Sequence, residues 1–298
     1  MFLHQIINGV TLGSIYALIA LGYTLVYGIL LMINFAHSEI FMIGAYIGLA
    51  LIYFSGVYLQ SKPIIFLLLI FLVSMSLIGC LGVLVERIAY RPLRHAPRLA
   101  PLLSAIGVSI ILQNLIMVGV SAQSLPYPDV FPIKRYTFYG FNISSLQIFI
   151  ITQSIILLII LHLFIHKTKL GRAMRACSQD MYISNLMGID VNKVVAITFF
   201  VGGGLGAAAG ILNGMYYGSI KYNMGFIPGI KAFTAAVLGG IGNIKGAVVG
   251  GYLLGIIESI GAGYLPAEYK DMIAFIILIL VLIFKPTGIF GEQIVQKT

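Results

Sequence analysis

Six long apolar stretches without any Asp, Glu, Lys or Arg dominate this chain of 298 residues. They cover residues 6 to 31, 40 to 57, 64 to 85, 101 to 120, 146 to 165 and 194 to 220. Each is near the roughly 20 residues that an α-helix needs to cross about 30 Å of hydrocarbon. A composition of 60% hydrophobic and 9% charged residues excludes a soluble globular domain, and the stretches are too long for β-barrel strands. The sequence predicts an all-α integral membrane protein, with residues 1 to 298 as one transmembrane domain.

The net charge of +9 is concentrated in three regions, which argues against a nucleic-acid partner. These regions contain Arg87, Arg91, Arg94 and Arg98, then Lys167, Lys169, Arg172, Arg175 and Lys193, and finally Lys285 and Lys297. Because Lys and Arg are enriched in cytoplasmic loops, we predict that all three are cytoplasmic and that residues 121 to 145 lie outside. No Lys or Arg precedes Lys62, so we expect no cleavable signal peptide and place the N-terminus outside.

The last third of the chain predicts a broken hairpin. Lys231 and the segment 266 to 271 both have to lie outside, so the chain between them must cross the membrane twice. The roughly 31 residues available would make about 46 Å of helix, which is too short for two full crossings. Residues 236 to 255 are therefore expected to form a half-helix, a turn at membrane depth made by Gly239, Gly240, Gly242 and Asn243, and a returning helix. Interrupted helices of this kind commonly mark a transport path. The expected total is eight membrane segments, of which the seventh is broken.

A similar polar interruption, Asn34 to Glu39, follows the first span. Asn34, His37 and Glu39 are candidates for the translocation path, because ionisable groups inside a membrane are usually functional. The alternative for Glu39 is that it supports the N-terminus of the helix starting near Ile40. For Glu258 we expect a position near the outer end of its helix, with the carboxylate extending to water.

Residues 166 to 193 contain a capped amphipathic helix. Ser178 is placed at the N-cap, Asp180 in the first turn and Gly188 at the C′ position. One apolar face would present Tyr182, Ile183, Leu186 and Met187 to a partner outside the bilayer. Asp190 is expected to cap the following span, which couples the two helices mechanically.

Glycines 202, 206, 210, 214 and 218 recur at every fourth position of that span. The spacing predicts a groove for close helix packing. The alternative is that smooth glycine faces slide during gating.

Energy-supplying and cofactor motifs are not expected in this chain. Lys245 follows Ile244 where a phosphate-binding loop needs Gly, and Gly202, Gly204 and Ala207 match a dinucleotide motif only inside a membrane span. His37 and Glu39 lack zinc-protease spacing, so we predict no metal site. Cys80 and Cys177 lie in different environments, and no disulfide is expected.

Three segments resemble the LivH-type permeases of the branched-chain amino acid ABC transporter family. They are NFAHSEIFMIGAYIG (34 to 48), RACSQDMYISNLMGID (175 to 190) and LGGIGNIKGAVVGG (238 to 251). One departure is Ser38, where the family usually has Gly. The resemblance implies a bacterial inner-membrane subunit with its translocation path between two permeases. The implied partners are a second similar permease, two cytoplasmic ATPases that receive residues 175 to 190 as the coupling segment, and a periplasmic solute-binding protein.

The expected function is import of leucine, isoleucine and valine, powered by ATP hydrolysis in the partner subunits and with no cofactor on this chain. Permeases for urea and short amides share much of the pattern and stay an alternative. A self-sufficient secondary transporter with His37 and Glu39 as a proton relay is a second alternative, although it would not need a docking helix. An intramembrane enzyme has little support, because no paired catalytic groups occur at workable spacing.

Overall fold

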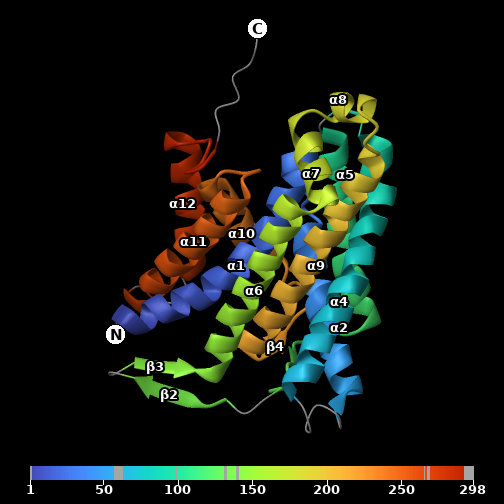
Figure 1. Cartoon of the computed structure of the whole chain (residues 1–298). Helices are drawn as coiled ribbons and strands as arrows, with labels where there is room; N and C mark the ends of the chain where they lie inside the picture. Colours follow the sequence, from blue (N-terminus) through green and yellow to red (C-terminus); the bar gives the residue numbers. More distant parts are fainter. Residues whose placement is uncertain are drawn as a thin grey trace.

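The computed structural model describes residues 2–56, 63–94, 96–97, 99–130, 133–138, 141–264, 266 and 269–291. The structure is built of helices (Figure 1). They are α1 (Phe2–Leu30), α2 (His37–Phe54), α4 (Pro63–Val85), α5 (Leu99–Gly119), α6 (Ser145–Lys167), α7 (Lys169–Gln179), α8 (Met181–Leu186), α9 (Val191–Tyr217), α10 (Phe226–Gly239), α11 (Ile244–Tyr264) and α12 (Lys270–Phe284). A π-helical turn, η1 (Glu86–Tyr90), and a 3-10 turn, η2 (Arg91–Leu93), extend α4.

Seven of the described helices are long and apolar enough to cross a membrane: α1, α2, α4 with its extension to Leu93, α5, α6, α9 and α11. Helix α10 is apolar but shorter. The predicted all-α, multi-span architecture is therefore confirmed. Arg98, Lys62, Lys297 and part of the segment 266 to 271, which supported the predicted orientation, lie outside the described residues.

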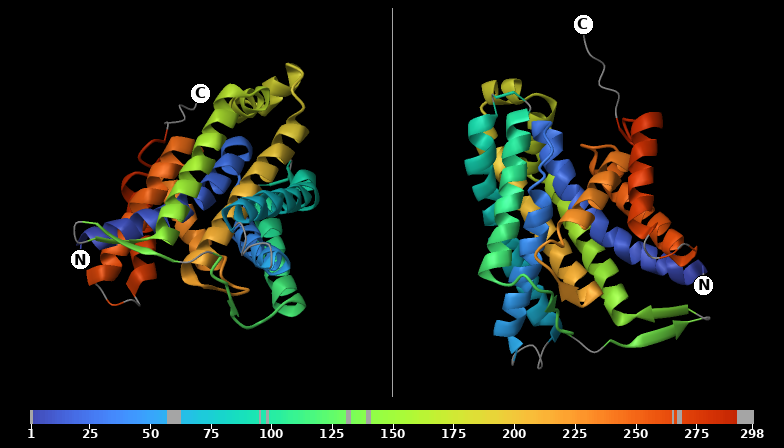
Figure 2. Two further views of the ribbon diagram at one scale, coloured as in Figure 1. Left: turned by 60° about the horizontal axis from the view of Figure 1, so that its bottom comes forward. Right: turned by 180° about the vertical axis from the view of Figure 1, so that it is seen from behind.

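The helices α7 and α8 lie at one end of the bundle, and two short antiparallel sheets lie toward the other (Figures 1 and 2). One sheet pairs β1 (Leu125–Pro126) with β4 (Ser219–Ile220), and the other pairs β2 (Arg135–Phe138) with β3 (Phe141–Ser144). We call these the α7–α8 end and the hairpin end. Helices α10, α11 and α12 form a lobe beside α1, as Figure 2 shows from behind.

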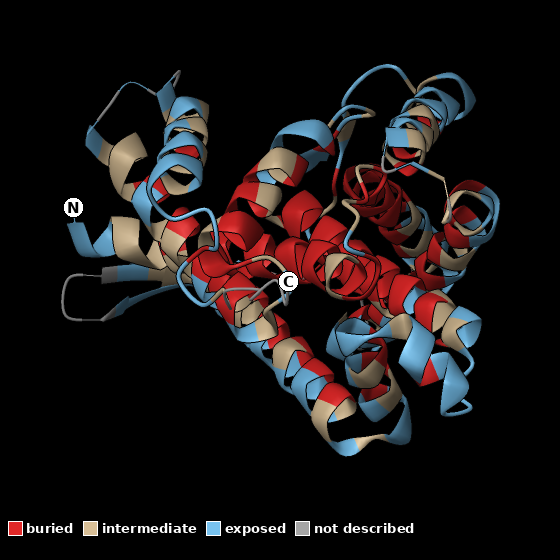
Figure 3. Cartoon of the chain, turned by 90° about the horizontal axis from the view of Figure 1, so that it is seen from above, coloured by how far each residue is buried: buried red, intermediate tan, exposed pale blue. Residues whose placement is uncertain are grey.

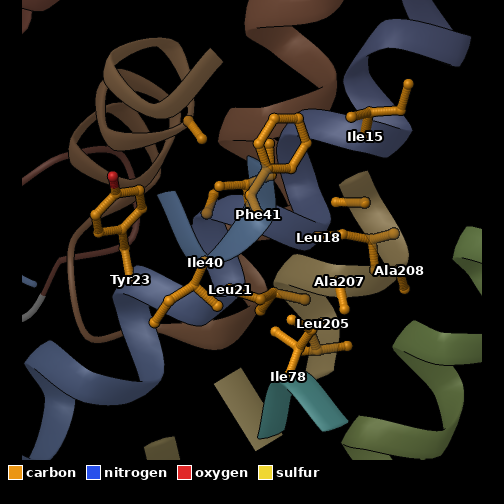
Figure 4. Packing of buried hydrophobic residues seen from close by; sticks show 14 of the residues in the cluster. Ile15, Leu18, Leu21, Tyr23, Ile40, Phe41, Ile78, Leu205, Ala207 and Ala208 are labelled. Atoms are coloured by element: carbon orange, nitrogen blue, oxygen red, sulfur yellow. The ribbon is translucent and has the colours of Figure 1, made fainter. Parts of the chain in front are cut away.

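The core runs along α1 and α9, whose residues are mostly buried. Figure 3 shows the buried residues at the centre of the bundle and the exposed ones on its periphery. Ile15 and Leu18 of α1, Phe41 of α2 and Ala207 of α9 belong to one buried cluster (Figure 4). In contrast, α4, α5, α6 and α12 present large apolar side chains outward, as expected for faces in contact with lipid or another subunit.

Small residues let the central helices pack backbone against backbone. A Cβ atom at Gly9 of α1 would lie 2.6 Å from the Cα atom of Ile256 in α11. At Gly210 of α9 it would collide with the carbonyl oxygen of Phe41 in α2. Gly202, Gly206, Gly210 and Gly214 of the predicted series thus face neighbouring segments, the first of the two expected uses, whereas Gly218 ends α9 with a φ of 65° and has open space around it.

Replacing Gly210 with valine should lower the stability of the chain by about 3 kcal/mol, because the added atoms collide with the α2 backbone. Gly107→Val in α5 is the matched control, since a Cβ atom there meets nothing within 4 Å. Thermal unfolding of the purified variants by scanning fluorimetry measures the difference. Equal unfolding temperatures for the two variants would contradict this packing.

The predicted α10–α11 hairpin is present, and its turn lies beside α7 instead of in the middle of the bundle. Gly240 and Gly242 have φ values of 106° and 95°, which favour glycine. The N–H groups of Ile289 and Phe290 donate to the carbonyls of Leu238 (2.8 Å) and Gly239 (2.9 Å), so a segment after α12 covers the turn. The turn, which includes Asn243, lies next to α7 at the α7–α8 end.

Candidate functional site

The non-helical segments before α2 and α10 meet in the middle of the bundle. A Cβ atom at Gly225, the residue before α10, would lie 2.9 Å from Oε2 of Glu39. His37, the first residue of α2, packs against Gly206 near the middle of α9. Neither helix has a side chain that caps its N-terminus. Two helix N-termini, each with a partial positive charge, therefore converge inside the fold.

His37 and Glu39 are both about 2% exposed in this junction. Oε1 of Glu39 lies 3.5 Å from Oγ of Ser109, whereas Oε2 has no hydrogen-bond partner among the described residues. The carboxylate lies in the first turn of α2 and next to the start of α10, so it stabilises both N-termini. The helix-supporting role considered for Glu39 agrees with this placement.

The imidazole of His37 packs against α1. Its ring centroid lies 5.0 Å from that of Tyr23 in an edge-on arrangement, and Nε2 has no hydrogen-bond partner in the described part of the chain. No hydrogen bond between His37 and Glu39 is found within the described residues. The arrangement gives no direct support to a proton relay between the two groups.

Asn34 fixes the break that precedes α2. Its side-chain oxygen accepts a hydrogen bond from the Tyr90 hydroxyl at 2.9 Å and another from the N–H of Ala36 at 3.1 Å. Asn34 and Tyr90 are both buried. The break is thus tied to η1, the π-helical turn at the end of α4.

The predicted docking segment forms a pair of short helices, α7 and α8, and its cap differs from the predicted one. Asp180, not Ser178, is the N-cap of α8, because its backbone is extended and its carboxylate accepts from the N–H of Ile183 at 2.9 Å. Ser178 continues α7, and its hydroxyl donates to the carbonyl of Arg175 at 2.8 Å. The C-terminal prediction is confirmed, since Gly188 has a φ of 82° and both it and Ile189 donate back to α8 carbonyls.

The apolar face of α8 is exposed, as predicted. Between 56% and 78% of each residue predicted for this face is accessible: Tyr182, Ile183 and Leu186 of α8 and Met187, the residue that follows it. A cluster of this size on a polar segment indicates a binding surface for another molecule.

The residues that join α8 to α9 are connected to the break at Asn34 by polar contacts. Asp190 caps α9 through the N–H of Lys193 (3.1 Å), and this hydrogen bond, with the Lys193 ammonium, holds the pKa of Asp190 below its usual value. Next to it, Oδ1 of Asn192 accepts from Nη1 of Arg94 at 2.7 Å. Arg94 in turn forms an ion pair with Glu86, which is fully buried in η1.

The same π-helical turn contains both Glu86 and Tyr90, so it joins the two sets of contacts. A continuous path of covalent and polar links runs from α8 through Asn192, Arg94, Glu86 and Tyr90 to Asn34. Sequence reasoning counted Arg94 only as a positive charge and did not find this path. A signal was present in Glu86, the carboxylate that directly precedes the four arginines.

The turn residues Gly239, Gly240, Gly242 and Asn243 lie apart from the Asn34–Glu39 break. Gly242 lines a cavity of about 90 Å³ together with Arg175 and Ser178 of α7 and Thr24 of α1. Asn243 caps α11, with Oδ1 accepting from the N–H of Gly246 at 3.1 Å. The structure therefore groups the turn with the docking segment.

The prediction for Glu258 is wrong. Its carboxylate does not extend to water but is fully buried, where it forms an ion pair with Lys231 at 2.8 Å. Cys80 is exposed and Cys177 is buried, and both are free. No group of three or more metal-ligating side chains occurs among the residues that the structure describes.

The family model for the branched-chain amino acid transport system, permease component, matches residues 5–282. The chain belongs to this family. The high-affinity branched-chain amino acid transport system permease protein BraD of Pseudomonas aeruginosa is 48% identical over 301 residues, which cover 99% of this chain and 98% of the relative. LivH of Escherichia coli K12, with the same description, is 43% identical over 302 residues, covering 99% and 97%.

A more distant relative is the probable branched-chain amino acid transport permease protein LivH of Methanocaldococcus jannaschii. It is 31% identical over 297 residues, which cover 94% of this chain and 89% of the relative. No solved structure gave a significant match. The names of these relatives are those of transport permeases, in agreement with the expectation of a transport subunit rather than an enzyme.

Proposed function

We propose that this permease is the membrane subunit of an ABC importer that moves leucine, isoleucine and valine inward, powered by two separate ATPase subunits. The observation that carries the proposal is the exposed apolar face of the capped helix α8, beside a path of polar contacts into the bundle. The names of the full-length relatives support the substrate class. A protein that moved its substrate without partners would not need such a face.

The proposed setting follows from the charges and the exposed surfaces. The α7–α8 end carries Arg87, Arg94 and Arg175 and is assigned to the cytoplasm of a bacterial inner membrane, with the N-terminus outside and the C-terminus inside. The whole chain acts as one transmembrane domain. Its partners are membrane lipid, a second similar permease against the apolar periphery and a periplasmic binding protein at the hairpin end.

Transport in this proposal is alternating access driven from α8. A displacement of α8 by an ATPase reaches α9 through Gly188 and Asp190, and reaches the Asn34 break through Arg94, Glu86 and Tyr90. Asn34, His37 and Glu39 lie beside the path, where helix N-termini stabilise a carboxylate and the surrounding apolar residues accept an aliphatic side chain. The turn from Gly239 to Asn243 lies next to α7 and moves with it.

Uptake into proteoliposomes containing all subunits tests this function. Labelled leucine should accumulate on the side of the membrane that carries the ATPases. It should do so only when ATP is present on that side and the binding protein is on the opposite side. An excess of urea or acetamide should leave the leucine uptake unchanged. Equal uptake without ATP would overturn the proposal in favour of a secondary transporter, and preferential uptake of urea would overturn the substrate class.

A further inference from the structure

Four charged side chains of both signs meet in the lobe formed by α10, α11 and α12. The Nζ atom of Lys231 lies 2.8 Å from Oε1 of Glu258 and 2.6 Å from Oδ1 of Asp271. Nζ of Lys270 lies 3.4 Å from the same Glu258 oxygen. The side chains of Glu258 and Lys231 are 0% and 5% exposed, whereas that of Asp271 is 48% exposed. The cluster therefore leads from water to a buried carboxylate, and its formal charges sum to zero.

The buried carboxylate has unused hydrogen-bonding capacity. Oε1 of Glu258 also lies 3.2 Å from the hydroxyl of Tyr16, but Oε2 is buried without a hydrogen-bond partner in the described part of the chain. An unpaired buried acceptor is costly, and most proteins avoid it. Lys231 has a second partner, Asp271, closer to water. It can therefore give up Glu258 without being left unpaired.

The cluster touches both central helices. Tyr16 belongs to α1, and the ring of Tyr217, the last residue of α9, lies 5.9 Å from Nζ of Lys270. Lys231 lies on α10, and the start of α10 packs against Ser38 and Glu39 at the junction where the N-termini of α2 and α10 meet. Buried ionisable residues in membrane proteins mark substrate and ion pathways. The cluster lies between the hairpin end of α9 and that junction, on the side assigned to the exterior.

We propose that Glu258 and Lys231 bind the ammonium and carboxylate groups of a free α-amino acid on its way through the permease, an inference that rests on the proposed function. In the structure the two side chains pair with each other and close the site. The incoming ammonium replaces Lys231 on Glu258 and uses the free Oε2, while Lys231 and Lys270 take the carboxylate. Only a zwitterion leaves every charge paired: a carboxylic acid alone leaves the buried Glu258 without a partner, and an amine alone leaves the 26% exposed Lys270 ammonium without one.

The test is the double variant Lys231→Met with Glu258→Gln in the complete transporter. Removing both charges leaves no unpaired buried ion, and such replacements are usually tolerated structurally. We expect normal assembly with the ATPases and normal ATP hydrolysis, but leucine transported per ATP should fall at least about tenfold, the effect of losing charge-assisted hydrogen bonds. Lys221→Met, which removes an exposed lysine from the link before α10, should leave this ratio unchanged.

A double variant that keeps the wild-type ratio of leucine to ATP would show that the ion pair is only structural and would overturn the site. In that case wild-type uptake still stands, so the proposed function is unaffected. If instead the wild-type transporter does not take up leucine, the proposed function itself fails. The two failures are therefore distinguishable.

A second measurement uses the wild-type complex, so it tests the site even if the double variant does not assemble. The wild-type complex in nanodiscs, without binding protein, should bind labelled leucine, and unlabelled leucine should displace it. Isoamylamine and 4-methylpentanoate, which keep the side chain but only one charged group each, should not. Absence of leucine binding, or displacement by either single-charge compound as effectively as by leucine, would overturn the proposal.

Discussion

The double substitution of Leu186 and Met187 by aspartate is expected to abolish ATP-driven leucine uptake. Both side chains belong to the exposed apolar face of α8, and their burial against an ATPase would contribute about 1.5–3 kcal/mol each. Their loss should weaken binding of the ATPase about a hundredfold or more. Co-purification of the ATPases with the permease, followed by uptake in proteoliposomes, measures both effects.

Asn185→Asp is the matched control for this result. Asn185 is exposed on the same short helix, and the change also introduces a carboxylate, but it removes no apolar surface. The control should retain the ATPases and most of the uptake. If both variants kept the ATPases bound, α8 would not be the docking helix.

The substitution of Glu86 by alanine should have the largest effect on stability. Glu86 is fully buried and pairs with both Arg91 and Arg94, and its removal leaves the largely buried Arg94 guanidinium unpaired. The expected loss is about 3–5 kcal/mol. Thermal unfolding of the purified permease measures this loss, and the yield of folded protein should fall with it.

The double variant Glu86→Leu with Arg94→Leu separates stability from coupling. It removes both buried charges, so most of the stability should return. The hydrogen bond from Arg94 to Asn192 is still absent, so the amount of leucine moved per ATP should stay low. Restored stability with a normal transport ratio would show that this path does not carry the movement of α8.

The spans were predictable because the apolar stretches are uninterrupted and membrane helices need a fixed length. The stretch 146 to 165, for example, corresponds to α6 (Ser145–Lys167). The exposed face and the C-terminus of α8 were also predictable, because both depend on local spacing. The N-cap was not, since Ser178 and Asp180 both suit that position and only the backbone conformation of Asp180 decides between them.

The other errors concern contacts between segments far apart in the sequence. Glu258 lies near a helix end in the sequence, a position from which a carboxylate often reaches water. Its pairing with Lys231 could not be predicted, because it depends on how α10 packs against α11. The turn at Gly239 was expected at membrane depth because two full crossings did not fit between residues 232 and 262. In the structure α10 starts inside the bundle at Phe226, so the hairpin fits with its turn at the α7–α8 end.

A crosslinking measurement at Tyr182 tests the account most directly. Tyr182 is 74% exposed on the apolar face of α8, so a photoreactive p-benzoyl-phenylalanine can replace it without disturbing the fold. Illumination of native membranes should join the permease to an ATPase subunit, identified by mass spectrometry of the product. Crosslinks only to lipid, or to a second copy of the permease, would contradict the claim that separate ATPases drive this chain through α8.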